Sequence, residues 1–170
     1  MTLLTAAATA ERVRSGRLTA VDATRQALAR IGDDAVHGWR VLRPEQALAE
    51  AAAVDTRPDR YALPLAGVPI AIKDNVAVSG HRMLDGVSEA CGAGLPVEQA
   101  DHPVVKRLRA AGAVVVGLTR VPELCLWAMT DDAREIVGNP HRPGRTAGGS
   151  SGGSAAVVAA GHVALAHGND

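Results

Sequence analysis

The chain has 170 residues, of which 47% are apolar and 21% are charged, and its formal net charge at pH 7 is zero. This composition is ordinary for a globular domain with one real core. The balanced charge gives no reason to expect nucleic acid or an acidic membrane surface as a direct partner. Only 2% of the residues are aromatic, so a base-stacking platform is not expected either.

The two cysteines, Cys91 and Cys125, stand far apart in the sequence. Their spacing is typical neither of a disulfide framework nor of a metal site, and it favours the reducing cytoplasm as the location. We expect no cofactor and no metal. No apolar run is long enough to span a membrane, so no membrane association is expected.

The first 60 residues are predicted to be a mainly helical cap. Thr19 is a suitable N-cap, and Pro44 suits the first position of a helix. Helices are expected over residues 5–15, 20–31 and 44–54, with a short strand over residues 39–42. Nothing in this part of the sequence indicates a chemical site.

Lys73 is one of only two lysines, and it follows a short apolar strand predicted over residues 70–72. Sites tend to form where strands of α/β sheets end. Two interpretations are open. Lys73 either snorkels to solvent or pairs with Asp74, or it is partly buried, loses its proton and acts as a base.

The middle of the chain predicts half of a crossover unit. A helix over residues 101–112, capped by Asp101, is followed by a strand over residues 113–118. This order indicates an α/β fold with a buried sheet covered by helices. A further short helix is expected over residues 122–127.

A glycine/serine loop, residues 148–154, leads into a small-residue helix predicted over residues 155–160. A tight structural turn is one interpretation. A phosphate cradle would need a lysine after Gly153, and none is present. The pattern G-x-S-x-G around Ser150 matches a nucleophile elbow, but the later acid and histidines are crowded and in the wrong order. The remaining interpretation couples the loop to Lys73, because a neutral lysine can activate a serine through a second serine.

Three segments, residues 67–75, 101–118 and 148–160, resemble the amidase signature family, and the resemblance covers nearly the whole chain. It implies a mixed β-sheet core covered by helices. Residues 1–170 would then form a single incomplete amidase domain, with 1–60 as the cap and 61–170 as the start of the catalytic core.

The resemblance also implies roles for individual residues. Lys73 corresponds to the general base and Ser150 to the relay serine, which follows Gly149 through a cis peptide bond. Ser151 corresponds to a neighbouring serine that supports the network. Ser154 is expected to be a helix N-cap rather than a catalyst.

The sequence departs from the family pattern at its end. The family nucleophile is a third serine in a G-x-D-x-G-G-S-type segment, and residues 168–170 resemble only the start of that segment, with Asp170 in a supporting place. We therefore expect the N-terminal part of an amidase. Such a chain would be inactive by itself, and only marginally stable because its sheet would have an uncovered face and edge.

The function that the resemblance implies is hydrolysis of the C–N bond of a small-molecule carboxamide through an acyl-enzyme, with a homodimer as a possible assembly. Two alternatives are kept. The chain could belong to one component of a glutamine-dependent tRNA amidotransferase, which would need partner subunits. It could also be a non-catalytic remnant that binds a partner.

Overall fold

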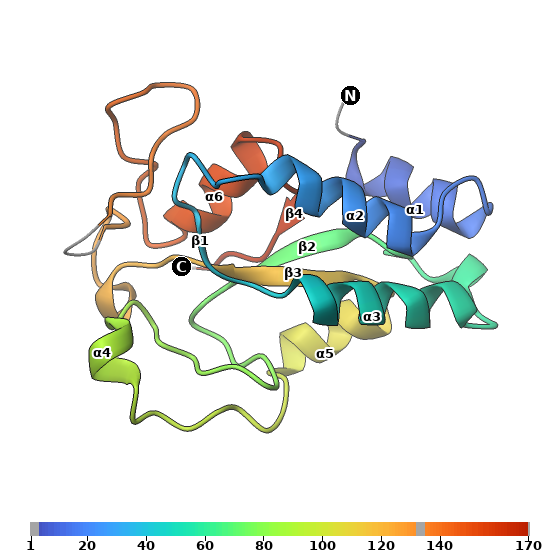
Figure 1. Ribbon diagram of the computed structural model, residues 1–170, viewed down its shortest axis with the longest axis horizontal. Coiled ribbons are helices and arrows are strands. Elements are labelled where there is room, and N and C mark those ends of the chain that lie inside the picture. The colour runs from blue at the N-terminus through green and yellow to red at the C-terminus, as the bar shows by residue number, and fades with distance from the viewer. Residues whose placement is uncertain (1–3, 132–134, 170) are drawn as a thin grey trace.

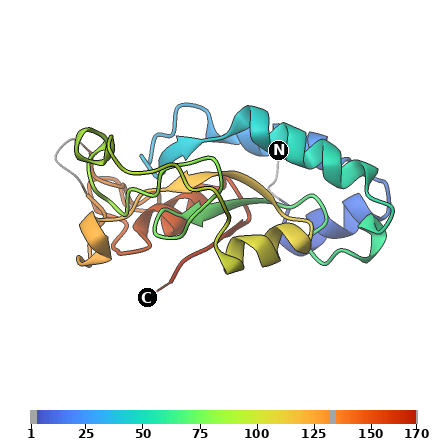
Figure 2. The same cartoon turned by 90° about the horizontal axis from the view of Figure 1, so that it is seen from below.

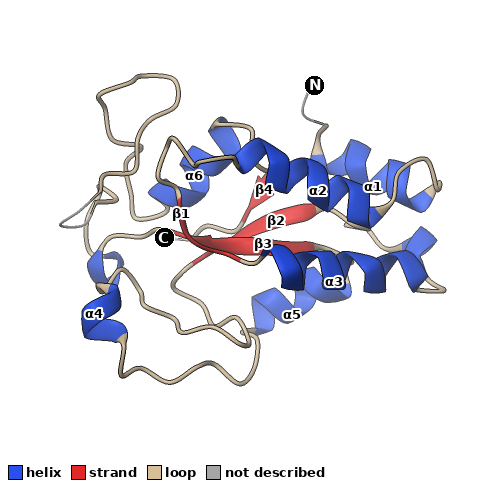
Figure 3. Cartoon of the chain, in the orientation of Figure 1, coloured by secondary structure: helices blue, strands red, loops and turns tan. Residues whose placement is uncertain are grey.

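The computed structural model describes residues 4–131 and 135–169, and its strands form one mixed sheet at the centre of the fold (Figures 1 and 3). Within this sheet the order is β1-β3-β2-β4. The strands are β1 (Trp39–Leu42), β2 (Pro69–Lys73), β3 (Val114–Thr119) and β4 (Leu165–Ala166). β2 runs parallel to both β3 and β4, whereas β1 is antiparallel to β3. The predicted mixed α/β fold is confirmed.

Helices cover both faces of this sheet. The α-helices of the described residues are α1 (Ala6–Arg14), α2 (Ala20–Ile31), α3 (Pro44–Thr56), α4 (Glu89–Gly92), α5 (Pro103–Ala110) and α6 (Gly152–Ala159). Figure 2 shows α3 and α5 on opposite sides of the sheet. Short 3₁₀ turns lie at Arg60–Ala62 and Glu123–Cys125.

Two apolar clusters hold these layers together. One joins the faces of α1, α2, α3 and α6 to alternate residues of β2 and β3, including Ala71, Val114 and Val116. The other packs Val105 of α5 against Ile70 and the opposite face of the same strands. Every residue of β2 and β3 is buried, as expected for parallel strands covered on both faces.

The N-terminal helices are fixed by polar contacts, of which the sequence predicts one. Thr19 Oγ1 accepts a hydrogen bond from the backbone N–H of Asp22 at 2.9 Å, which confirms the predicted N-cap. Asp55 in α3 accepts from the N–H groups of Ala20 and Val21 at 2.8 and 3.1 Å. This carboxylate therefore satisfies the start of α2 and ties it to α3.

Several local predictions were wrong. His102, not Asp101, caps α5, because the Asp101 carboxylate binds Ser79 N–H and Arg109 instead. The helix predicted over residues 122–127 is only the 3₁₀ turn, since Leu124 and Cys125 have positive φ and break a helix.

The glycine-rich end of the chain also differs from expectation. α6 begins at Gly152, so Ser154 lies inside the helix and is not its N-cap; Ser151 occupies the cap position without a side-chain cap bond. The sequence does not predict strand β4, which joins the sheet at the edge of β2.

In residues 4–131 and 135–169, no helix combines the length and the apolar character needed to cross a membrane. The same part of the chain contains no group of three or more His, Cys, Asp or Glu side chains placed to hold a metal ion.

Candidate active site

Lys73 and Ser150 meet at the carboxyl end of β2. Lys73 is the last residue of that strand, and its side chain is fully buried. Its Nζ donates to Ser150 Oγ at 2.8 Å and to the backbone carbonyl of Asn169 at 3.1 Å. The structure thus brings together the two residues for which catalytic roles were expected.

The carboxylate of Asp74 points away from this pair. It contacts the guanidinium of Arg40 through Nε and Nη2, the second at 2.9 Å. The alternative pairing of Lys73 with Asp74 is therefore not what the structure shows. Burial raises the pKa of Asp74 to about 6, although the hydrogen bonds and charge of Arg40 act to lower it.

The peptide bond between Gly149 and Ser150 is cis, as the family resemblance implied. Thr130 holds the loop around this bond: its Oγ1 donates to Gly148 O at 2.9 Å and accepts from Gly152 N–H at 3.2 Å. Thr130 is buried and was not found from the sequence. A single threonine between Met129 and Asp131 carries no local signal of such a role.

Ser151 binds the segment that passes over Lys73. Its Oγ donates to the carbonyl of Asn169 at 2.8 Å and accepts from the Asn169 N–H at 3.3 Å. Asp170, expected to support the site, lies outside the described residues. Ser151 and Lys73 thus donate to the same carbonyl, that of Asn169.

Ser154 lies deeper in the fold. Its Oγ is 2.7 Å from Thr119 Oγ1 and donates to the carbonyl of His167 at 2.8 Å. These contacts join α6 to β3 and to the residue after β4. Ser154 therefore helps to hold α6, β3 and the end of β4 together around the site.

Cys125 lies close enough to the pair for both members to affect its thiol. Its Sγ donates to Asp85 Oδ1 at 3.3 Å. Burial and this hydrogen bond raise the pKa of the Cys125 thiol, while Lys73 and Ser150 act in the opposite direction. The thiol is therefore kept in its protonated form, which is a weak nucleophile.

Beside the loop lies an exposed apolar segment, residues 124–129. The exposed fractions are 53% for Leu124, 75% for Leu126, 66% for Trp127 and 47% for Met129. A Cβ at Gly149 would lie 2.9 Å from the backbone of Met129 and of Trp127. The apolar segment thus runs directly against the cis peptide bond.

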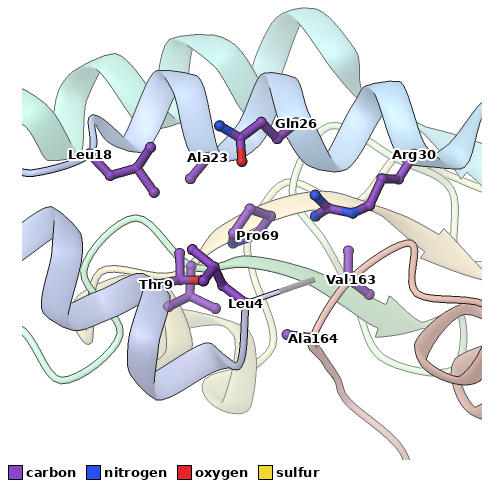
Figure 4. A pocket seen from close by; sticks show the side chains of 10 residues that line it. Leu4, Thr9, Leu18, Ala23, Gln26, Arg30, Pro69, Val163 and Ala164 are labelled. Carbon is purple, nitrogen blue, oxygen red and sulfur yellow. The ribbon is translucent and has the colours of Figure 1, made fainter. Parts of the chain in front are cut away.

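Two hollows also lie in the described part of the chain. Figure 4 shows one of about 20 Å³ lined by α1, α2 and the segment between α6 and β4, with Gln26 and Arg30 reaching from α2. It has room for about one water molecule. The other, of about 240 Å³, is lined by residues that include Arg40 and Asp74. Neither is lined by the Lys73–Ser150 pair.

This geometry allows proton transfer through a serine. An amine and a hydroxyl at 2.8 Å are within reach for direct transfer. A serine hydroxyl that gives its proton to a base can take one from a second hydroxyl and thereby activate it. The described residues thus hold an amine and a hydroxyl at a distance that suits such a transfer.

Comparisons with known proteins show the family of the chain. A family profile described as Amidase matches residues 22–170. AmiB2 of Mycobacterium tuberculosis, named provisionally as an amidase, is 46% identical over 169 residues; the match covers 97% of this chain and 36% of AmiB2. A glutamyl-tRNA(Gln) amidotransferase subunit of Chloroflexus aurantiacus is 40% identical over 172 residues, covering 98% of this chain and 35% of that protein.

Solved structures give the same result for the fold. The structure of 6-aminohexanoate cyclic dimer hydrolase superimposes with a TM-score of 0.89 at 32% identity, covering 100% of this chain and 35% of that one. Among the curated relatives, the chain spans 36% of the length of AmiB2 and 35% of the length of the amidotransferase subunit.

Proposed function

The chain belongs to the amidase family, and on that premise we propose that it supplies the base and the relay serine of an enzyme that hydrolyses the C–N bond of a carboxamide. The observation that carries the proposal is the 2.8 Å contact between the buried Lys73 amine and Ser150 Oγ. Ser151 supports the pair through its two bonds to Asn169. No cofactor is needed for this chemistry.

In the proposed reaction, the neutral Lys73 amine takes the proton of Ser150, and Ser150 takes the proton of an attacking serine. That serine comes from outside residues 4–169. Its oxygen bonds to the amide carbon, and collapse of the tetrahedral intermediate breaks the C–N bond. Lys73 returns its proton through Ser150 to the departing nitrogen, leaving an acyl-enzyme that water hydrolyses.

The test is replacement of Lys73 in the enzyme that contains this chain. Lys73→Met should reduce kcat for a simple carboxamide by about 10²–10⁴-fold, the usual contribution of a general base, and Ser150→Ala should also cause a large loss. Ammonia release measures the rate. Lys106→Met is the matched control, because Lys106 is exposed on α5. Near-normal turnover by Lys73→Met would contradict the proposal.

The 170-residue chain alone is expected to hydrolyse no carboxamide, because the attacking serine of the proposed reaction is not among the described residues that form this site. The same ammonia assay on the purified chain tests this. Turnover that survives purification and disappears in Lys73→Met would show that the chain contains a complete site.

A second candidate function is that of an amidotransferase component. It is favoured by the 40% identity to the glutamyl-tRNA(Gln) amidotransferase subunit. Such a protein would release ammonia from glutamine for transfer to a charged tRNA, and it would co-purify with partner subunits. Isolation without partners, together with hydrolysis of simple carboxamides, would favour the amidase. Stable capture of a partner without either activity would indicate a non-catalytic remnant.

The cytoplasmic location and the homodimer remain parts of this proposal. Both cysteines are free thiols, which suits a reducing compartment. The oligomeric state of the purified protein can be read by light scattering.

A further inference from the structure

Asn75 lies two residues beyond Lys73 and turns back toward it. The Asn75 N–H donates to the carbonyl of Lys73 at 2.8 Å. Its side-chain Nδ2 donates to Asn169 Oδ1 at 3.0 Å. Its own Oδ1 is buried and accepts no hydrogen bond in the described part of the chain. The hydrogen bond that this amide makes is therefore directed at Asn169.

Asn169 contacts the Lys73 amine through its backbone carbonyl. Its carbonyl accepts from Lys73 Nζ at 3.1 Å and from Ser151 Oγ at 2.8 Å. A neutral amine has two N–H groups and one lone pair, so an N–H donated to Asn169 restricts where the lone pair can point. The position of the Asn169 carbonyl thus bears on how the Lys73 amine is oriented toward Ser150.

We propose that Asn75 is a positioning residue for the Lys73–Ser150 pair. By holding the Asn169 side chain, it fixes the Asn169 carbonyl over Lys73 and keeps the amine aimed at Ser150. This proposal rests on the proposed function of Lys73, but the placement of the amine can be measured without turnover. Asn75 and Asn169 are separated by 94 positions in the sequence, so their contact joins two segments that are far apart along the chain.

The experiment measures how often Lys73 becomes accessible. The purified chain is acetylated briefly with an N-hydroxysuccinimide ester, and the modification of each lysine is read by peptide mass spectrometry. Lys106, the only other lysine, is exposed and serves as the internal reference. In Asn75→Ala the ratio of Lys73 to Lys106 modification should rise about fivefold, the effect of losing one hydrogen bond that closes a segment.

Further variants separate positioning from general loosening. Asn169→Ala should raise the ratio equally, and the double variant should add little, because both remove the same bond. Asn75→Asp keeps the size of the side chain but loses the donor, and it should behave like Asn75→Ala. Asn139→Ala is the matched control: its side chain accepts from His141 and Arg142 N–H far from the site, and the ratio should not change.

Amide hydrogen exchange of Val114–Thr119, the buried strand β3, reports opening of the whole fold. The proposal requires the Lys73 ratio to rise without faster exchange there. An unchanged ratio in both Asn75 variants overturns it, and so does a rise that only follows faster exchange of β3. If the ratio rises as expected but Lys73→Met retains turnover in the parent enzyme, the positioning stands and the proposed function fails.

Discussion

Gly153 is the second residue of α6 and part of the glycine/serine loop, and other backbone segments approach it closely. A Cβ at Gly153 would lie 2.7 Å from the backbone nitrogen of Arg120 and 2.7 Å from the carbonyl oxygen of Gly38. Backbone atoms cannot move aside as the end of a flexible side chain can. Residue 153 is therefore restricted to glycine by its surroundings and not by its φ angle.

We expect Gly153→Ala to lower the free energy of unfolding by about 1–3 kcal/mol, the usual cost of overpacking a close contact. Urea unfolding followed by circular dichroism measures the change. Gly138→Ala is the control, since a Cβ there has no neighbour closer than 3.9 Å, and it should stay within about 0.5 kcal/mol of the wild type. Equal stability of the two variants would show that the contacts of Gly153 relax at no cost.

At the level of elements, β1 and the end of α6 are joined by a pair of rings. Trp39 Nε1 donates to Nδ1 of the buried His162 at 3.1 Å, and the two rings stack with centroids 6.5 Å apart. Nδ1 must be unprotonated to accept this bond. Burial lowers the pKa of His162 more than Asp34, 3.9 Å from Nδ1, raises it.

This pair predicts a loss of stability in mild acid. The pKa of His162 is lower in the folded state than its ordinary value of about 6.5, so the unfolded chain binds more protons below that pH. Stability is therefore present above about pH 6.5 and is lost as the pH falls through the folded value. His81 and His167, whose pKa values burial also lowers, act in the same direction.

The free energy of unfolding, measured with denaturant, should be lower at pH 5.5 than at pH 7.5. In His162→Asn, which keeps an acceptor for Trp39 but does not titrate, this difference should be about 1 kcal/mol smaller. Asp74 acts oppositely: its pKa is raised, so its contribution to stability grows as the pH falls from about 6 toward 4. An identical pH dependence in wild type and His162→Asn would contradict the role of the ring pair.

The elements that the sequence predicted well are those with strong local signals. Apolar β-branched runs identified β2 and β3, and the chemistry of Lys73 and of the glycine/serine loop pointed to one site. Contacts between residues far apart in the sequence have no local sequence signal. Examples are Arg40 with Asp74, Thr130 with the glycine/serine loop, and Asn75 with Asn169. β4 was missed because it has two residues and exists only through pairing with β2.

At the scale of the whole molecule, the apolar segment 124–129 is an exposed surface that favours association with another molecule. Several large apolar side chains there are exposed beside the site, and such patches favour association. We expect the 170-residue chain to self-associate through this segment at high concentration. Leu126→Glu with Trp127→Glu should shift it to monomer in light scattering without changing unfolding by more than about 0.5 kcal/mol.

Tyr61→Glu provides the control for this prediction. Tyr61 is 71% exposed on the 3₁₀ turn Arg60–Ala62, away from the apolar segment, and its replacement should leave association unchanged. If both variants reduce association equally, net negative charge and not the apolar segment is responsible.

The separation of 96 positions between Lys73 and Asn169 has a consequence for synthesis. At about 5–20 residues per second, roughly 5–20 s pass on the ribosome between the two residues. For most of that time β2 and its lysine have been synthesised, whereas the glycine/serine loop and β4 have not. The amine is therefore hydrated when it is made, and it is dehydrated late, when β4 docks beside β2. Parallel pairing over such distances is slow, and the nascent chain offers chaperones an unfinished sheet edge throughout this interval.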